Sequence, residues 1–459
     1  MANGIPRIVV GGVSSSSGKT TVMTALAGAL RGAGLQVACF KCGPDYLDPT
    51  WHRRSSGRPA HNLDGWMMGR EAVLRTFERG SRGADIALIE GVMGLFDGAS
   101  PTSDEGSTAQ IARWLQAPVL LTVDAGGMAR TMAALVAGFC EFDPRLDLAG
   151  VLANRVGSAG HLDLLKEALN GRVPFVFGLP KKPAERFPER YLGLHAARDD
   201  GRYDPLVKTW AGIGREWLPA DELLQLAARS GPLPAAPLPA GGRSGPRVRV
   251  ALARDEAFQF YYEDNLSLLE AAGAELIPFS PLTDTALPAG VGGVYLGGGY
   301  PEVHAEELAA NRSMHESLRS FAADGGPVYG ECGGLMYLCQ AIQREGRDHP
   351  MAALLPGTAV LTDKLQALGY VEVTTRRDSP LGPAGQTFRG HQFRYSRLEE
   401  VGEGETYQVR RKRNGQTHAE GYHSQNVLGS WVHAHWASQP GVAAAWVESC
   451  RRFGGQHGG

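Results

Sequence analysis

The chain has 459 residues, which is too long for one hydrophobic core and predicts two or three domains. Lys and Arg total 46 against 48 Asp and Glu, and this near balance argues against nucleic acid or a membrane surface as the main partner. No apolar run reaches membrane-spanning length, and residues 1–7 leave no room for a signal peptide before the first apolar run. Six scattered cysteines are typical of a reducing compartment, so we expect a cytoplasmic protein.

The first chemical signal is the turn GGVSSSSG at residues 11–18, between a short apolar run and a helical pattern. This strand–loop–helix order is typical of a loop that binds phosphate through backbone N–H groups and a helix N-terminus. Lys19 can neutralise phosphate charge, and the Thr20 hydroxyl can bind Mg²⁺. Gly12 and Gly18 enclose five residues instead of the usual four, a looser form of the motif. The alternative is a serine-rich turn without a ligand.

Polar residues follow several strand-like apolar runs farther along the chain. Asp45 and Asp48 lie in a loop bounded by Pro and Gly, while Glu90 ends an apolar run and Asp97 follows it. In open α/β sheets, ligands bind outside the carboxyl ends of strands, so these carboxylates are expected to face the nucleotide. For Asp45 and Asp48 a turn-forming role remains open. Asn154 follows another strand and is expected either to contact a purine base or to cap a helix.

Apolar runs and helical stretches alternate in both halves, which predicts α/β domains with parallel sheets. A Pro- and Gly-rich stretch separates the halves and indicates a linker. The expected divisions are a first domain at 1–227, the linker at 228–246, a second domain at 247–445 and a tail at 446–459.

The second half contains a cysteine between a strand-like run and a helix. Cys332 is followed by two glycines, a turn that can lift a thiol out of a sheet and place it at a helix N-terminus, which lowers its pKa. The alternative is a buried structural cysteine. A run of three glycines around Gly298 can form an oxyanion hole. His433 and His435 would share one face of a strand, so periodicity allows either as the base.

Together these motifs resemble the cobyrinate a,c-diamide synthases, the glutamine-dependent amidases of corrin-ring biosynthesis. The matching segments, in order, are FKCGPDYLDP at 40–49, EGVMGLFDG at 90–98, residues 258–266, GGGYPE at 297–302 and GHQF at 390–393. The first half is similar to dethiobiotin-synthetase-type P-loop enzymes, and the second to class I glutamine amidotransferases with a flavodoxin-like fold. Two residues depart from the family pattern: Gln392 stands where a glutamate is expected, and Cys42 replaces a small apolar residue.

The resemblance implies a ligase that joins two reactions. ATP phosphorylates a substrate carboxylate, and ammonia attacks the acyl phosphate. The ammonia comes from glutamine, whose side-chain amide is attacked by Cys332 with His433 as the base. Most class I amidotransferases carry a glutamate two residues after this histidine; His435 stands there, so the resemblance implies a Cys–His dyad.

The resemblance also implies the residues of each site. The ATP-binding set is Gly12, Ser15, Gly18, Lys19, Thr20, Thr21, Lys41 and Asn154. The Mg²⁺ and acyl-phosphate set is Thr20, Asp45, Glu90 and Asp97. The oxyanion and glutamine set is Gly298, Gly299 and Gly333.

The expected small molecules are ATP, L-glutamine and a tetrapyrrole polycarboxylate, with the a and c acetate groups of cobyrinate as the sites of amidation. Hydrogenobyrinate and nickel-sirohydrochlorin are alternative substrates. A partitioning-type ATPase with a degenerate second domain is a rival of another class, but Ser14 stands where those proteins commonly carry a second lysine. The oligomeric state is open, with a homodimer as one candidate.

Overall fold

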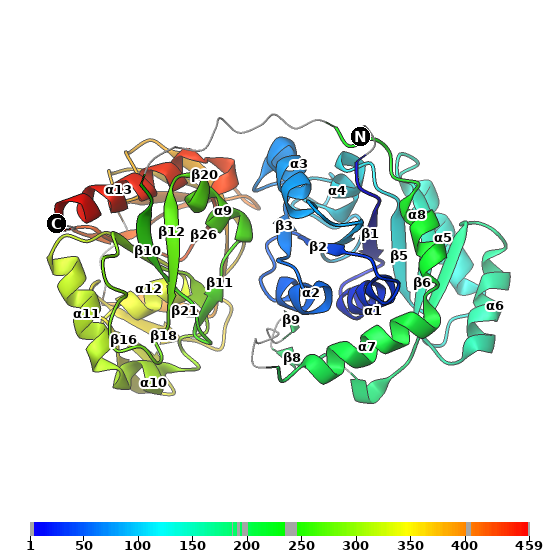
Figure 1. Ribbon diagram of the computed structural model, residues 1–459, viewed down its shortest axis with the longest axis horizontal. Coiled ribbons are helices and arrows are strands. Elements are labelled where there is room, and N and C mark those ends of the chain that lie inside the picture. Colours follow the sequence, from blue (N-terminus) through cyan, green and yellow to red (C-terminus); the bar gives the residue numbers. More distant parts are fainter. Residues whose placement is uncertain are drawn as a thin grey trace. The chain divides into compact units, whose positions relative to one another are not determined.

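The computed structural model describes residues 4–185, 187–190, 193–194, 201–234, 246–400 and 405–457. The chain forms two compact units, Met1–Leu238 and Pro239–Gly459, which Figure 1 colours from blue to green and from green to red. The boundary between them falls inside the segment expected to be a linker, and residues 235–245 of that segment lie outside the described residues.

The beginning of the expected linker packs against the first unit. Ser230 Oγ donates a hydrogen bond to the carbonyl of Arg7 at 3.0 Å. The fully buried Arg7 guanidinium donates to the carbonyls of Gly231 at 2.5 Å and Leu115 at 2.6 Å, and burial lowers the pKa of Arg7 to about 10. The first unit therefore extends past residue 227, to at least Gly231.

The first unit is built on a seven-stranded parallel sheet with the order β3-β2-β4-β1-β5-β6-β7. Its strands are β1 (Arg7–Gly12), β2 (Val37–Cys42), β3 (His61–Leu63), β4 (Ile86–Glu90), β5 (Val119–Asp124), β6 (Leu148–Val156) and β7 (Phe175–Pro180). The helices are α1 (Lys19–Gly32), α2 (Asp48–Ser56), α3 (Gly69–Gly80), α4 (Thr108–Trp114), α5 (Thr131–Phe142), α6 (Ala159–Leu169), α7 (Asp204–Trp217) and α8 (Ala220–Ala227), with a 3₁₀ turn η1 (Pro183–Glu185) and the short pair β8 (Glu189–Arg190) and β9 (Gly193–Leu194).

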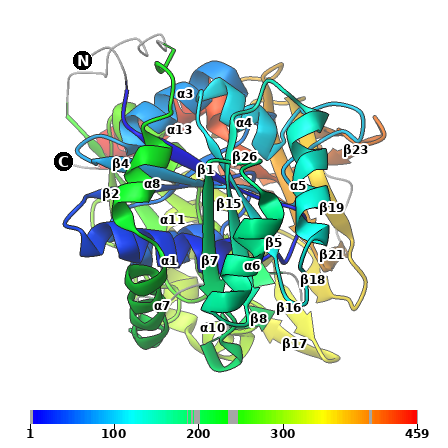
Figure 2. The same ribbon diagram turned by 90° about the vertical axis from the view of Figure 1, so that its right-hand side faces the viewer.

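Helices cover both faces of this sheet because its strands alternate buried side chains between two cores. Ile8 and Val10 of β1 join one core, together with Leu26 of α1 and Trp210 of α7. The turned view in Figure 2 shows α1 and α7 side by side. On the opposite face, the Phe40 ring of β2 packs against Phe77 of α3 at 5.0 Å between centroids.

The second unit contains one mostly parallel sheet and two smaller main sheets. The six-stranded sheet has the order β12-β10-β13-β15-β25-β24, and only its last pair is antiparallel. Its strands are β10 (Val248–Ala253), β12 (Ala274–Phe279), β13 (Gly293–Leu296), β15 (Val328–Glu331), β24 (Tyr422–Ser424) and β25 (Val427–Ser430). An antiparallel sheet follows the order β23-β22-β19-β20-β26, with β19 (Ala367–Thr375), β20 (Thr387–Arg394), β22 (Tyr407–Arg411), β23 (Thr417–Glu420) and β26 (His433–His435). The third sheet contains β16 (Ala341–Arg344), β17 (Arg347–Pro350), β18 (Thr358–Leu361) and β21 (Ser396–Glu399), and β11 (Phe258–Phe260) pairs with β14 (Gly298–Gly299).

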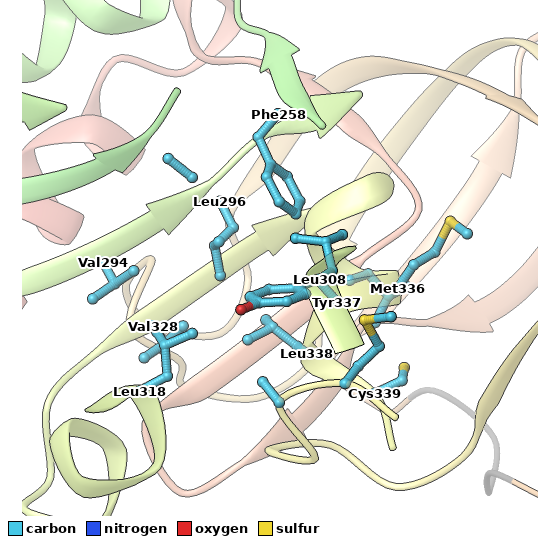
Figure 3. Close-up of a cluster of buried hydrophobic side chains, with 14 of the residues drawn as sticks. Phe258, Val294, Leu296, Leu308, Leu318, Val328, Met336, Tyr337, Leu338 and Cys339 are labelled. Atoms are coloured by element: carbon cyan, nitrogen blue, oxygen red, sulfur yellow. The ribbon is translucent and has the colours of Figure 1, made fainter. Parts of the chain in front are cut away.

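Two hydrophobic cores hold the second unit together. Figure 3 shows the first, in which Val294, Leu296 and Val328 of the six-stranded sheet pack with Leu318 of α11 (Arg312–Ala323) and Tyr337 of α12 (Gly333–Leu338). The other face of the sheet packs against the five-stranded sheet and α9 (Glu263–Ala271). The remaining helical elements are α10 (Ala305–Ala310), α13 (Gly441–His457) and the 3₁₀ turn η2 (Trp436–Ser438).

The end of the chain differs from the expected tail. Residues 446–457 continue α13, and the side chains of Trp446, Val447 and Cys450 are fully buried in the second core. The spacing of these residues puts them on one face of a helix. The Gly-rich composition of the last residues conceals this short amphipathic pattern.

Candidate active sites

The glycine- and serine-rich loop connects the end of β1 to the start of α1. Gly12 is the last residue of β1, and Lys19 is the first residue of α1. Gly18 precedes the helix in the left-handed conformation, with φ of 87°, and a Cβ there would lie 2.2 Å from Asn154 Nδ2. Glycine is therefore required at this position. This geometry is the one that binds phosphate groups at a helix N-terminus.

The Lys19 side chain folds back over the loop. Its Nζ donates hydrogen bonds to the carbonyls of Ser14 at 3.0 Å and Met93 at 2.6 Å. Burial and the nearby charge of Lys41 lower the pKa of Lys19 to about 8. A phosphate group beside this ammonium would favour its charged form. Lys19 is thus placed to exchange two carbonyl partners for phosphate oxygens.

A buried cluster of charged side chains adjoins the loop and joins β2, α2 and β4. Lys41 Nζ lies 2.5 Å from Asp48 Oδ2 and 2.9 Å from Glu90 Oε1. Thr20 Oγ1 lies 3.1 Å from Glu90 Oε1 and 3.3 Å from Asp48 Oδ1, and can donate its one hydrogen to either. His52 Nε2 lies 2.8 Å from Glu90 Oε2. The structure therefore brings the Thr20 hydroxyl together with two carboxyl groups.

The pKa values of the two carboxyl groups in this cluster, Asp48 and Glu90, are shifted in opposite directions. Burial opposes charge on both Lys41 and Asp48. Lys41 nevertheless keeps the pKa of Asp48 below its usual value, and Asp48 and Glu90 keep the pKa of Lys41 above its usual value. Burial, helped by Asp48, raises the pKa of Glu90 to about 8, and burial lowers the pKa of His52 to about 4. Near neutral pH, Lys41 and Asp48 are an ion pair, His52 is neutral and Glu90 retains a proton.

Two other carboxylates of the predicted set hold backbone turns. Asp45 Oδ1 accepts the N–H groups of Leu47 and Asp48, at 2.8 and 2.9 Å, at the start of α2. Burial and Asp48 raise the pKa of Asp45 to about 6. Asp97 is exposed, and its Oδ2 accepts the N–H of Gly94 at 2.9 Å. Both contacts shape the loops that follow β2 and β4.

Asn154 supports the phosphate loop from β6. Its Nδ2 donates to the carbonyl of Ser17 at 2.9 Å, and its Oδ1 accepts the N–H of Arg155 at 3.0 Å. Each polar atom makes one bond, which leaves one N–H of Nδ2 and one lone pair of Oδ1 for a purine base. Ser15 is exposed in the loop, and Thr21 is half-buried in the first turn of α1.

In the second unit, Cys332 lies in the sharp turn between β15 and α12. Its φ of 49° and ψ of −100° are unusual for a residue with a side chain and indicate a strained backbone. The N–H of Cys332 donates to the carbonyl of Ser430 at 2.7 Å, and its carbonyl accepts the N–H of Met336 at 3.0 Å. The strand–cysteine–helix turn that the sequence predicts is present.

Three backbone segments approach one another closely beside Cys332. A Cβ on Gly333 would lie 3.1 Å from the backbone nitrogen of Gly299, and a Cβ on Gly298 would lie 2.4 Å from His433 Cε1. Only glycines allow these approaches. The structure therefore brings together the predicted oxyanion residues and His433. Backbone N–H groups next to a nucleophile are the donors that stabilise an oxyanion.

The two histidines of β26 have different surroundings. His433 lies opposite His391 of β20, and burial together with His391 lowers the pKa of His433 to about 3. The His435 ring packs against the Tyr262 ring at 4.6 Å between centroids. Because His433 contacts Gly298, this geometry favours His433 over His435 as the base.

The sequence predicts that the helix N-terminus lowers the pKa of the Cys332 thiol, and this prediction is wrong for the resting site. Burial and Glu302 raise the pKa of Cys332 to about 12, against opposing effects of Arg394 and the N–H of Gly333. Helix α12 has only six residues, and the thiol is buried beneath its first turn. The resting pair is therefore a neutral thiol and a neutral imidazole, so attack requires the thiol proton to be transferred.

Sequence reasoning missed two buried groups that hold these sites. His52 lies four residues after Asp48 on α2, a spacing that places both on one helix face and was a usable signal. Glu331 directly precedes the cysteine turn and accepts hydrogen bonds from the hydroxyls of Tyr329 at 2.7 Å and Tyr295 at 3.1 Å. Burial raises the pKa of Glu331 to about 7.

Comparisons with known proteins match both units. A "CobQ/CobB/MinD/ParA nucleotide binding domain" model matches residues 8–187, and a "CobB/CobQ-like glutamine amidotransferase domain" model matches residues 249–441. A cobyrinate a,c-diamide synthase of Leptospira interrogans is 48% identical over 98% of this chain and 99% of its own length. The chain belongs to the cobyrinate a,c-diamide synthase family. A second member, from Syntrophotalea carbinolica, is 46% identical over 97% of this chain and 99% of its own length. A hydrogenobyrinate a,c-diamide synthase of Streptomyces coelicolor is 39% identical over 97% of this chain and 98% of its own length.

Membership of the cobyrinate a,c-diamide synthase family agrees with both sites. The nucleotide-binding model covers the phosphate loop and the Lys41 cluster, and implies a nucleotide as cosubstrate. The amidotransferase model covers Cys332 and His433. Within the described part of the chain, no helix is both long and apolar enough to cross a bilayer.

Proposed function

We propose that the chain amidates the a and c acetate groups of cobyrinate, using ATP and L-glutamine. One observation carries this proposal: a single chain holds a phosphate loop beside a Lys–carboxylate cluster and a strained cysteine beside a histidine and glycine backbone. The full-length relatives named cobyrinate a,c-diamide synthase support the choice of substrate.

The first unit activates the carboxylate. A carboxylate resists attack by ammonia because oxide is a poor leaving group, whereas phosphate is a good one. The substrate oxygen attacks the γ-phosphorus of ATP, ADP leaves, and an acyl phosphate forms. Ammonia then attacks the acyl carbon and phosphate leaves. Lys19 and the helix N-terminus hold the phosphates, and the cluster around Lys41 fixes the charges beside them.

The residues of this cluster fit Mg²⁺. Thr20 and the carboxyl groups of Asp48 and Glu90 are oxygen ligands of the kind that Mg²⁺ prefers, and Mg²⁺ usually keeps water and phosphate oxygens as its other ligands. The described residues contain no group of three His, Cys, Asp or Glu side chains that would hold a metal ion alone. Bound Mg²⁺ would neutralise phosphate charge during transfer. Asp45 and Asp97 remain in the proposed Mg²⁺ and acyl-phosphate set because they stabilise the loops beside this cluster through backbone hydrogen bonds.

The second unit releases ammonia. The Cys332 thiol gives its proton to His433 as the sulfur attacks the glutamine amide carbon, and His433 then protonates the leaving ammonia. The N–H groups near Gly298, Gly299 and Gly333 stabilise the oxyanion. Water, with His433 as the base, hydrolyses the thioester and releases glutamate. A Cys–His dyad suffices in this scheme, since His435 packs on Tyr262.

The macrocycle is tested by steady-state amidation with cobyrinate, hydrogenobyrinate and nickel-sirohydrochlorin, each purified and supplied with ATP and glutamine. We expect kcat/KM to be highest for cobyrinate. The Streptomyces relative is named a hydrogenobyrinate a,c-diamide synthase. Turnover of hydrogenobyrinate alone by this chain would replace the metal-containing substrate in this proposal.

We further infer a cytoplasmic enzyme, because all six cysteines are free thiols, as a reducing compartment favours. A homodimer is the assembly that we propose. Light scattering at micromolar concentration tests it: twice the mass of the chain, which is 49.0 kDa, supports a dimer, and the single mass overturns it.

A further inference from the structure

Arg394 is anchored beside the cysteine turn by two separate contacts. At the end of β20, its guanidinium lies over the Trp431 ring, 4.7 Å from the centroid, and Trp431 follows the residue whose carbonyl accepts the Cys332 N–H. Arg394 also donates to the carbonyl of Ser396, whose hydroxyl lies 3.8 Å from Met336 Sδ in the turn after Cys332. The guanidinium is therefore held beside the cysteine turn.

The charge of Arg394 is compensated only in part by the protein. The side chain is half-buried and Nε has no hydrogen-bond partner. The buried carboxyl group of Glu420 favours the charged form of Arg394, but its oxygens accept hydrogen bonds from Ser430 and Trp431. Burial lowers the pKa of Arg394. A partly desolvated cation that forms no direct ion pair is costly, and an anionic ligand bound to it lowers that cost.

Glu302 approaches the same thiol from another segment. It follows Pro301, whose Cδ lies 2.9 Å from the position of a Cβ on Gly333, and its side chain is half-buried. Glu302 raises the pKa of Cys332 and Arg394 lowers it, so opposite charges act on the nucleophile from separate segments.

This pair of charges matches one feature of the substrate. Free L-glutamine carries a carboxylate and an ammonium group on Cα, at the far end of a short side chain from the amide that Cys332 attacks. We propose that Arg394 binds the α-carboxylate of glutamine and Glu302 binds its α-ammonium group. The inference rests on the proposed function and deepens it. Its consequence is selectivity for the free amino acid over glutamine whose α-groups are blocked.

The first test compares L-glutamine with L-glutaminamide, whose α-carboxylate is replaced by a neutral amide, by following hydrolysis of the side-chain amide. We expect the wild type to prefer glutamine at least about tenfold in kcat/KM, because a charge-assisted hydrogen bond is lost with the analogue. In Arg394→Gln, KM for glutamine rises while hydrolysis of glutaminamide changes little, so the preference disappears. Arg394→Lys retains part of it. An equal loss for both substrates would show a structural role and overturn the assignment.

The second test applies the same logic to Glu302 with N-acetyl-L-glutamine, which lacks the α-ammonium charge. Glu302→Gln is expected to lower kcat/KM for glutamine and to leave the slow hydrolysis of the acetylated analogue unchanged. Glu306→Gln, at an exposed carboxylate of α10, is the matched control and should behave like the wild type. If Glu302→Gln keeps the wild-type preference for free glutamine, the assignment of Glu302 is wrong.

Ammonia-driven amidation separates the failure of this inference from the failure of the proposed function. Both variants should amidate cobyrinate with added ammonia at the wild-type rate, because the first unit is unchanged. If the variants retain ammonia-driven activity and their glutamine selectivity is unaltered, only the proposed roles of Arg394 and Glu302 are overturned. Absence of cobyrinate amidation in the wild type under both conditions would overturn the proposed function.

Discussion

Lys41 Nζ lies 2.9 Å from Glu90 Oε1, and both side chains are at most 3% exposed. The two residues are register partners on the adjacent parallel strands β2 and β4. Their contact with Asp48 and Thr20 places a buried charge network directly beside the phosphate loop. The order of strands in the sheet thus brings Lys41 and Glu90 together, although they belong to different sequence motifs.

Replacing Lys41 is expected to destabilise the first unit strongly. Lys41→Met leaves the Asp48 carboxylate buried without its cation, and loss of one partner of a buried pair costs roughly 3–5 kcal/mol. Native-state hydrogen exchange in β2 and β4 measures this loss within the first unit. The double variant Lys41→Met, Asp48→Asn should recover part of it; equal protection in the wild type and Lys41→Met would contradict the account.

His52 is expected to act by positioning Glu90. Its Nε2 lies 2.8 Å from Glu90 Oε2, so His52→Ala frees one carboxyl oxygen to reorient. We expect the loss of such a supporting contact to lower amidation about 10–100-fold with either glutamine or ammonia, by analogy with supporting residues of metal sites. Glutamine hydrolysis should not change. His52→Gln should restore part of the rate, and Arg53→Ala, at an exposed neighbour, serves as the control. Wild-type amidation by His52→Ala would refute this role.

The raised pKa of Glu90 predicts the direction in which the free energy of unfolding changes with pH. Its pKa is raised from 4.5 to about 8 in the folded protein, so the unfolded chain loses this proton first as the pH rises. The contribution of Glu90 to stability is therefore complete below about pH 4.5 and is lost as the pH rises towards 8, by at most about 1.4 kcal/mol per pH unit. Urea unfolding at several pH values should show a shallower decline in Glu90→Gln. Parallel profiles for wild type and variant would contradict the shift.

The sequence predicts the central strands well because their signals are local. The apolar runs before the phosphate loop and before Glu90, at 8–10 and 86–89, fall in β1 and β4, each ending where a polar or Gly-rich loop begins. The antiparallel sheet of β19, β20 and β22 was not anticipated, because its register depends on pairing between distant segments.

The sites show the same division between local and long-range information. Cys332 and the phosphate loop were found from strand–loop–helix motifs. The Lys41–Glu90 pairing depends on β4 lying between β1 and β2, which is a property of topology. The direction of the thiol pKa shift was wrong because burial of Cys332 comes from packing by distant segments.

The approach of Gly298 to His433 predicts a selective defect. A Cβ in Gly298→Ala would lie 2.4 Å from His433 Cε1, so the imidazole must move away from its place beside the cysteine turn. A displacement of about 1 Å costs on the order of 100-fold in rate. Glutamine hydrolysis should fall accordingly, while ammonia-driven amidation persists. Gly455→Ala has open space in α13 and is the control. Wild-type glutaminase activity in Gly298→Ala would show that His433 is not the base.

The central claim is that one chain couples glutamine hydrolysis at Cys332 to ATP-dependent amidation in the other unit. The most direct measurement is the rate of cobyrinate amidation by Cys332→Ala, with ATP and either glutamine or ammonia as the nitrogen source. We predict that the glutamine-driven reaction is lost and that the ammonia-driven reaction proceeds at the wild-type rate. Continued amidation with glutamine, in the absence of free ammonia, would contradict the assignment of Cys332 as the nucleophile.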